Sequence, residues 1–254
     1  MNPISATIIT YNEENRIVAC LDSLEGIADE IIVVDSHSTD RTVEICRQRG
    51  CRVVERKLAG YGAQRQYATS LTTHPYILSI DADEILSPAL AQSILKIKKE
   101  GFIHRVYCFS RLNFFCGIPV RHSGWYPDMQ TRLFDKRYAN WNLRDVAEKV
   151  IFRDSVRPQR LDGDLLHYRC DTIEEYETTE RRHAALRGRV LAASCNNIFP
   201  GTATINALKA FMKTYFGQGA MLDGAEGRAI AIESYRSTLL SYKLASRLIE
   251  RKKK

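Results

Sequence analysis

Three carboxylates within four positions follow a short apolar segment in the first half of the chain. Residues 76–80 are mostly apolar, and Asp81, Asp83 and Glu84 come directly after them. Such a run predicts a buried strand, and in open α/β sheets ligands bind where the strands end. Two aspartates separated by one small residue can present oxygen atoms to a divalent cation, Mg²⁺ or Mn²⁺, that also holds a diphosphate. The alternative is a surface turn before a helix, where the helix dipole favours acids.

Two earlier segments also end in polar side chains. Residues 4–10 are rich in β-branched side chains and are followed by Tyr11 and Asn12, whereas the apolar residues 30–34 run into Asp35. Both segments have the composition of strands. Because parallel strands deliver their carboxyl ends to one edge of a sheet, these groups and the later aspartates are expected to form a nucleotide site there.

The elements that must position these groups alternate between strand and helix patterns. Strands are predicted at residues 4–10, 30–35, 51–55 and 76–81, each followed by a segment with helical spacing of apolar residues. Ser38 or Thr39 is expected to cap the second helix, and Ser87 the helix that starts at Pro88. The alternation predicts an α/β fold of right-handed βαβ units with a mostly parallel central sheet.

The motifs that hold phosphates in other nucleotide-binding folds are missing from the sequence. The first strand is not followed by Gly-x-Gly-x-x-Gly, and no Walker-type loop ending in Lys-Ser or Lys-Thr occurs. Dinucleotide oxidoreductases and P-loop NTPases are therefore disfavoured. A metal ion on the aspartates is the alternative way to hold a diphosphate.

The rest of the chain divides into two further segments that differ in residue composition and in predicted secondary structure. Residues 105–112 alternate like a strand, residues 124–134 are aromatic and polar, and a highly charged helical pattern runs from residue 172 to about residue 193. We therefore expect a nucleotide-binding half at residues 1–110, an acceptor-binding and catalytic half at 111–195, and a basic, amphipathic helical segment at 196–254.

The positive charge is concentrated in that last segment. It holds ten Lys or Arg and four Asp or Glu, a balance of +6 out of a net +7, so general nucleic-acid binding is disfavoured. The final helix has an apolar stripe with charged residues elsewhere, which suits an anionic membrane surface, packing on the domain, or a homodimer contact. The stripe consists of Ile232, Tyr235, Leu239, Tyr242 and Ile249.

Composition points to the cytoplasm. The seven cysteines include no Cys-x-x-Cys pair, the start lacks a basic leader, and no uncharged apolar run approaches the ~18 residues of a membrane span. These features predict a cytoplasmic protein that sits peripherally on the inner face of the cell membrane.

The combined motifs resemble family-2 glycosyltransferases of the GT-A fold, with a Rossmann-like nucleotide-binding half. The resemblance rests on residues 7–14, 32–40 and 81–84. Residues 124–128, 132–134 and 222–224 are similar to a narrower group, the lipopolysaccharide-core β-glucosyltransferases. The match covers nearly the whole chain. The expected fold is therefore a GT-A domain with a C-terminal helical extension.

The resemblance implies an inverting transfer of a hexose, with a UDP-hexose as the expected donor and a lipopolysaccharide-core, lipid-linked or polysaccharide acceptor. Asp81 would contact the ribose, while Asp83 and His167 would hold the metal ion. Plainer alternatives are that Arg65 is a solvated helical residue and that His167 is a packed residue without a ligand role. The residues implied in substrate binding are Thr10, Tyr11, Glu13, Asp35, Gln64, Arg65, Asp81, Trp125, Tyr126 and Arg132.

Such a reaction needs one general base to take the proton of the acceptor hydroxyl. Glu148 is the first candidate, because relatives carry Val-His-Glu where this chain has Val-Ala-Glu, with Ala147 as the departure. Asp128 is the second candidate. Either acid could instead pair with Arg132, Arg144 or Lys149.

Two other classes of function fit parts of the same pattern. A nucleotidyltransferase also pairs carboxylates with a metal ion, but here the first strand lacks the Gly-rich basic loop that would hold a triphosphate. A non-catalytic nucleotide-sugar or glycan-binding protein would need neither Glu148 nor Asp128.

Overall fold

The computed structural model describes residues 2–143, 148–152, 155–195 and 197–253, and its chain forms two compact units. The first unit comprises Met1–Arg111 and Asp128–His167, and the second comprises Leu112–Pro127 and Tyr168–Lys254. The first division, after Arg111, falls beside the expected boundary at residue 110, and further divisions fall after Pro127 and His167. The reason is that the chain returns to the sheet of the first unit after residue 127.

The first half of that sheet is parallel, as the sequence predicted. β1 pairs in parallel with β2 and with β4, and β2 pairs with β3, which gives the order β3-β2-β1-β4. β1, β2 and β4 are mostly buried because each has apolar side chains for both faces, whereas Arg52 and Glu55 of the edge strand β3 are exposed. Their bounds are β1 (Ile4–Thr10), β2 (Glu30–Asp35), β3 (Arg52–Glu55) and β4 (Tyr76–Asp81).

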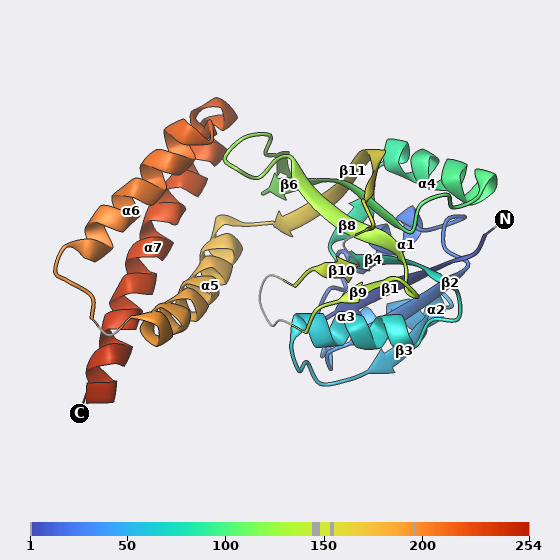
Figure 1. Cartoon of the computed structure of the whole chain (residues 1–254), viewed down its shortest axis with the longest axis horizontal. Helices are drawn as coiled ribbons and strands as arrows, with labels where there is room; N and C mark the ends of the chain where they lie inside the picture. Colours follow the sequence, from blue (N-terminus) through green and yellow to red (C-terminus); the bar gives the residue numbers. More distant parts are fainter. Residues whose placement is uncertain (1, 144–147, 153–154, 196, 254) are drawn as a thin grey trace. The chain divides into compact units, whose positions relative to one another are not determined.

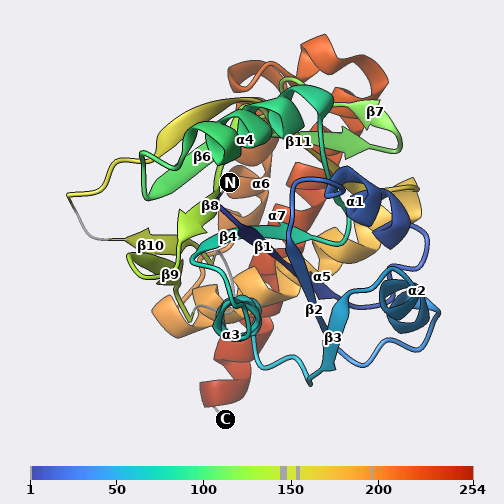
Figure 2. The ribbon, with the colours of Figure 1, turned by 90° about the vertical axis from the view of Figure 1, so that its right-hand side faces the viewer.

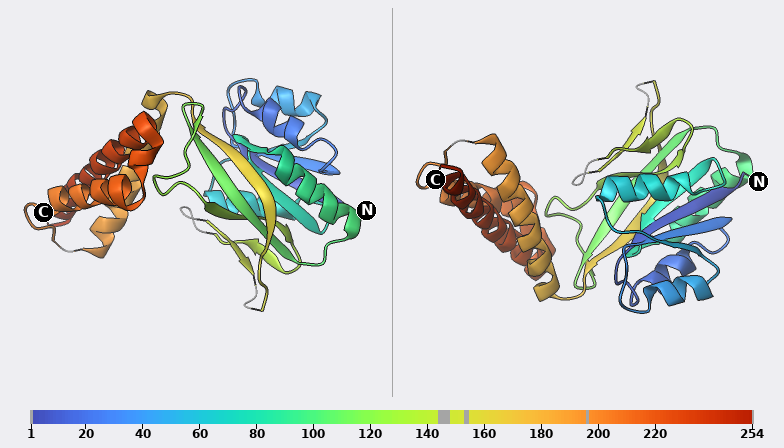
Figure 3. Two further views of the ribbon diagram at one scale, coloured as in Figure 1. Left: turned by 90° about the horizontal axis from the view of Figure 1, so that it is seen from above. Right: turned by 90° about the horizontal axis from the view of Figure 1, so that it is seen from below.

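Helices cover both faces of these strands (Figures 2 and 3). On one face Ile8 and Val33 pack with residues of three helices, α1 (Ile17–Ser23), α2 (Thr42–Gln48) and α4 (Pro88–Glu100). On the other face Ala68 of α3 (Tyr61–Ser70) packs against Ile32 and Val34. This double cover explains why the strands read as continuous apolar runs.

The helix starts agree with the sequence in one case and differ in the other. The Ser87 hydroxyl accepts a hydrogen bond from the Leu90 amide at 3.2 Å, so the predicted cap of α4 is confirmed. The predicted cap of α2 is wrong, because that helix begins at Thr42 and its N-cap residue is Arg41. Ser38 instead bonds back to Asp35.

The second half of the sheet is antiparallel and continues the order as β4-β8-β6-β11-β5. β6 and β11 each run from the first unit into the second. A separate pair, β9 with β10, completes the first unit. The bounds are β5 (Glu84–Leu86), β6 (Val106–Phe115), β7 (Ile118–Pro119), β8 (Asp128–Asp135), β9 (Ala139–Trp141), β10 (Val150–Phe152) and β11 (Gln159–Cys170).

The second unit is mainly helical, which confirms the predicted C-terminal extension (Figure 1). Its long final helix packs along two others, and Gly188 allows a close approach, since a Cβ there would lie 2.9 Å from the Ser241 carbonyl oxygen. No helix in the described ranges is long and apolar enough to cross a membrane. The bounds are α5 (Ile173–Ser194), α6 (Thr202–Met212), η1 (Lys213–Gly217), η2 (Ala220–Asp223) and α7 (Gly224–Lys253).

Candidate active site

The strand register brings the three polar strand ends side by side. Thr10 pairs with Asp35 across β1 and β2, and Ile9 pairs with Asp81 across β1 and β4. The expectation that these ends gather at one edge of the sheet is met by this register. The hydroxyl of Thr10 is buried there, and it makes no hydrogen bond within the described part of the chain.

Hydrogen bonds tie the loops after β1 and β2 to each other. Asn12, whose φ is 54°, accepts from the Thr39 amide at 2.8 Å and donates its own amide to the Ser38 hydroxyl at 2.8 Å. Both carboxylate oxygens of Asp35 accept from Ser38, at 2.5 and 2.7 Å. Asp35 is fully buried, so its first role is to shape this loop.

The neighbouring predicted contacts differ in how accessible they are. Tyr11 is 57% exposed at the end of β1, whereas Gln64 is fully buried and donates to the Arg56 carbonyl at 3.1 Å and the Ser36 hydroxyl at 3.3 Å. Glu13 donates its amide to the Thr42 hydroxyl at 2.8 Å. Tyr11 is therefore the accessible member of this group, and Gln64 supports the loop after β2.

Two buried arginines hold the first aspartate of the acidic motif. Arg65 Nη2 donates to Asp81 Oδ2 at 2.8 Å, Arg65 Nη1 lies 2.6 Å from Oδ1, and Arg132 Nη2 donates to Oδ2 at 3.2 Å. Burial opposes the ionisation of Asp81, but the two guanidinium charges outweigh it and hold the pKa of that carboxyl well below its usual range. Arg65 is thus a buried ion-pair partner and not a solvated helical residue.

Glu84 is the centre of the same network. It is fully buried, Oε1 accepts from Arg132 at 3.2 Å and from Arg111 at 3.0 Å, and Oε2 accepts from the Asp81 amide at 2.9 Å. Arg111 also holds Asp128, with Nη2 2.7 Å from Oδ2. Acids and arginines therefore alternate from the end of β4 to the start of β8.

Sequence reasoning missed two members of this network, Arg111 and Trp141. The Trp141 ring is buried, and the guanidinium carbons of Arg65 and Arg132 lie 4.8 and 5.3 Å from its centre. Arg111 meets Glu84 and Asp128 through the pairing of β6 with β8. The one signal for Arg111 was its polar side chain within the alternating strand of residues 105–112.

The second aspartate of the motif faces a histidine from the far end of the first unit. His167 Nε2 lies 3.2 Å from Asp83 Oδ2, and the two side chains are 14% and 22% exposed. An imidazole nitrogen beside a carboxylate oxygen at an accessible edge is a donor pair that suits Mn²⁺ or Mg²⁺ when a diphosphate supplies further oxygens. No group of three or more acidic, His or Cys side chains arranged for a metal ion is found among the described residues.

The two candidate bases differ in how fully their oxygens are engaged. Asp128 accepts from Arg111 at 2.8 Å on Oδ2 and from Gln130 at 2.7 Å on Oδ1. Glu148 accepts from Arg65 Nε at 3.3 Å on Oε1, and its side chain is 18% exposed. Asp128 therefore pairs with Arg111 and Glu148 with Arg65, and not with Arg132 or Lys149 as the alternative had it. Arg144, Val146 and Ala147 lie outside the described residues.

Trp125 and Tyr126 belong to the second unit, whereas the other twelve predicted site residues belong to the first. Within its own unit Trp125 lines a cavity of about 400 Å³. The Arg169 guanidinium lies 4.8 Å from the Trp125 ring and donates to Glu180 at 2.9 Å. The other lining residues are Ser123, Gly124, Tyr176, Arg187, Thr214, Gln218, Ile230, Ser234, Ser237 and Thr238.

The loop that carries Trp125 is fixed by an acid far along the chain. Asp223 accepts from the amides of Arg121 and His122 at 3.3 and 3.1 Å and from the Ser123 hydroxyl at 2.7 Å. The motif of residues 222–224 therefore lies beside residues 121–123, which directly precede the motif of residues 124–128. The sequence suggested no role for Asp223.

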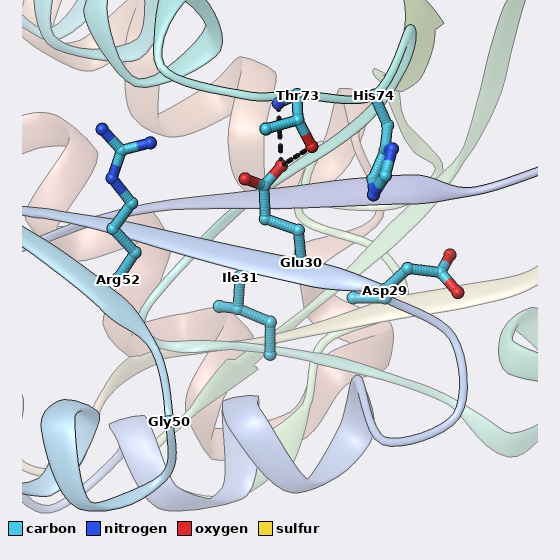
Figure 4. Close-up of a pocket in the computed structure, with 8 residues that line it drawn as sticks. Asp29, Glu30, Ile31, Gly50, Arg52, Thr73 and His74 are labelled. Carbon is cyan, nitrogen blue, oxygen red and sulfur yellow. Dashed lines mark hydrogen bonds between the residues drawn. The ribbon is translucent and has the colours of Figure 1, made fainter.

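A further cavity of about 530 Å³ lies at the opposite edge of the sheet (Figure 4). Its acids are already paired, since Glu30 accepts from the Thr73 amide at 2.9 Å and Asp29 lies 2.7 Å from Lys98 Nζ. It contains none of the predicted site residues. The lining consists of Ala28, Asp29, Glu30, Ile31, Gly50, Arg52, Thr73 and His74.

Comparison with known proteins gives a family match over most of the first unit. The glycosyl transferase family 2 model matches residues 5–157. An uncharacterised glycosyltransferase of Rickettsia felis is 30% identical over 236 residues, 89% of this chain and 83% of that protein. The lipopolysaccharide core biosynthesis glycosyltransferase LpsC of Rhizobium meliloti is 26% identical over 255 residues, 98% of this chain and 93% of that protein.

Solved structures give a partial match. Glucosyl-3-phosphoglycerate synthase of Mycobacterium tuberculosis, crystallised with Mn²⁺, uridine diphosphate and glucosyl-3-phosphoglycerate, aligns with 25% identity and a TM-score of 0.37. The alignment covers 44% of this chain and 44% of the synthase, less than half the length of either.

Proposed function

This chain belongs to glycosyl transferase family 2, and from that premise we propose that it transfers a hexose from a nucleotide-diphosphate sugar to an acceptor with inversion of configuration at C1. The family confirms the expected GT-A class, and the α/β sheet with a parallel nucleotide-binding half agrees with it. Membership also favours glycosyl transfer over nucleotidyl transfer or binding alone. UDP is the proposed nucleotide.

The observation that carries the proposal is the pair formed by Asp83 and His167. Their 3.2 Å contact involves Asp83, two residues beyond the end of β4, the strand that pairs with β1. We propose that these two side chains hold a divalent cation, which when bound would neutralise charge on the leaving diphosphate. Asp81, Thr10 and the exposed ring of Tyr11 are proposed to contact the nucleoside part.

The remaining steps fall to the chain's own side chains. The acceptor hydroxyl oxygen attacks C1 of the hexose, the bond from C1 to the diphosphate oxygen breaks, and the nucleoside diphosphate leaves with that electron pair. The hydroxyl proton goes to a carboxylate positioned beside the acceptor. Arg65 and Arg132 keep Asp81 ionised and oriented while this occurs.

We propose Glu148 as that base. A base needs a carboxylate oxygen that can accept a proton, and both oxygens of Asp128 already accept from Arg111 and Gln130. The hydrogen bond to Glu148 involves Oε1 and is longer, at 3.3 Å. This difference supports Glu148 over Asp128.

The acceptor is proposed to be a lipopolysaccharide-core, lipid-linked or polysaccharide glycan. The likeness to LpsC over 98% of this chain supports that class. The cavity beside Trp125 supports a sugar contact, because it combines an aromatic ring with arginine, amide and hydroxyl groups. A lipid-linked acceptor also agrees with a peripheral position on the inner face of the cell membrane.

Thermal unfolding in the presence of candidate donors tests this proposal. A nucleoside diphosphate at about 100 times its Kd should stabilise the protein by about 2.7 kcal/mol, which raises Tm by roughly 5–10 °C at this chain length. The stabilisation should appear with Mn²⁺ or Mg²⁺ and fall sharply in excess chelator. If uridine, guanosine and thymidine diphosphates and their hexose esters all leave Tm unchanged with metal present, the proposal fails.

A further inference from the structure

An exposed apolar surface runs along α6, η1 and η2 in the second unit. Each of its seven large side chains is between 47% and 73% exposed. Monomeric proteins rarely leave such a run of large apolar groups in water without a partner. We call this group of side chains the α6 face: Ile205, Leu208, Met212 and Phe216 form its helical part, and Phe199, Met221 and Leu222 flank that part in sequence.

The α6 face follows from how this part of the chain packs. Ile205, Leu208, Met212 and Phe216 recur at intervals of three or four residues, so they share one side of a continuous helical stretch. α6 packs against α7 (Figure 1), and its small residue Ala207 is fully buried. The large apolar side chains therefore point away from the core of their own unit.

The stripe on α7, by contrast, is largely used inside the unit. Ile249 is 6% exposed and belongs to an apolar cluster with Ala192 of α5, because α7 packs along both α5 and α6. Ile232, at 40% exposed, is the most accessible member of the stripe. The apolar surface that remains for a partner is therefore on α6 and not on α7.

The charged residues within α6 and η1 have one sign. Residues 202–217, which form α6 and η1, contain Lys209 and Lys213 and no Asp or Glu. Lys209 and Lys213 are exposed and sit between the apolar residues of the α6 face in sequence, and neither forms an ion pair with any described residue. Lysines beside an apolar helical side are complementary to anionic headgroups above an acyl layer.

We propose that the α6 face docks on an anionic lipid surface. Phe216, Leu208 and Met212 would enter the boundary between headgroups and acyl chains, while Lys209 and Lys213 would meet phosphate groups. A protein partner would have to present acidic groups to Lys209 and Lys213 beside an apolar surface. The inference goes beyond the proposed sugar transfer, and vesicle binding without any sugar donor separates the failure of one from the failure of the other.

Vesicle flotation of the full chain tests this docking. The wild type should float with phosphatidylglycerol-containing vesicles, bind phosphatidylcholine vesicles more weakly, and detach as salt is raised from about 0.1 M to about 1 M. Replacing Leu208, Met212 and Phe216 together by Ser should lower the partition coefficient at least about 100-fold. Lys209→Gln with Lys213→Gln should lower it about 30-fold on anionic vesicles, at roughly fivefold for each charge.

A matched control replaces three exposed apolar residues of the first unit by Ser. Leu95, Ile103 and Ile151 are 42%, 86% and 57% exposed, and their replacement should leave vesicle binding unchanged. Equal binding of the wild type to neutral and anionic vesicles would overturn the proposal, as would unchanged binding by the lysine variant. So would a wild-type dimer that the triple Ser variant splits while vesicle binding persists, since the α6 face would then be a contact between copies.

Discussion

Replacing Glu148 by glutamine is expected to lower kcat about 10²- to 10⁴-fold, the usual contribution of a general base. The amide keeps the shape of the side chain and its contact with Arg65 Nε, but it cannot take the proton of the acceptor hydroxyl. Binding of the nucleotide should stay within a few-fold of wild type, because Glu148 is assigned to the acceptor side. Steady-state transfer kinetics together with a nucleotide titration of the same variant measure both quantities.

Asp128→Asn is the matched comparison. Its carboxylate is paired with Arg111 and is not assigned the acceptor proton, so kcat should fall by much less than the roughly 10²-fold minimum expected for a lost general base. The reverse order, with Asp128→Asn the more damaging change and Glu148→Gln nearly neutral, would move the base to Asp128. Equal and small effects in both variants would place the base elsewhere.

Removing the carboxylate of Glu84 is expected to have the largest effect on stability. Glu84→Ala leaves Arg132 and Arg111 without their shared buried partner and removes the acceptor of the hydrogen bond from the Asp81 amide. Breaking a buried ion pair from one side typically costs about 3–5 kcal/mol. Urea unfolding followed by circular dichroism should therefore show a lower midpoint for the transition of the first unit.

An exposed ion pair provides the control for that measurement. Glu55 lies 3.0 Å from Arg47 with both side chains well exposed, and Glu55→Gln should change the free energy of unfolding by less than about 0.5 kcal/mol. A Glu84→Ala protein as stable as the control would show that the network is dispensable for folding. The arginines would then have to find other partners or water.

What the sequence could predict was mainly local. The acids at the ends of β2 and β4 follow directly from apolar runs that end in polar residues, and the parallel register then sets Thr10 beside Asp35. The cap at Ser87 was equally local, because its partner is three residues away. The cap expected at Ser38 was wrong, since the amide and the hydroxyl of Ser38 both donate to the nearby carboxylate of Asp35.

Contacts between distant segments were beyond such reasoning. Asp83 and His167 are 84 residues apart, and only the likeness to a family paired them with one metal. Arg111 joins Glu84 to Asp128 because β6 and β8 pair with one particular register, which no periodicity in the sequence specifies. The apolar stripe of α7 was visible in the sequence, but two neighbouring helices cover most of it.

The most direct test of the central claim is a calorimetric titration of UDP into wild type and Asp83→Ala, each with Mn²⁺ and with chelator. The wild type should bind at least about tenfold more tightly with Mn²⁺ than without it, which is the scale of a lost metal contact. Asp83→Ala should bind weakly and equally in both conditions. Identical affinity of the wild type with and without metal, or a variant that keeps the full effect of Mn²⁺, would contradict the assignment of the acidic motif.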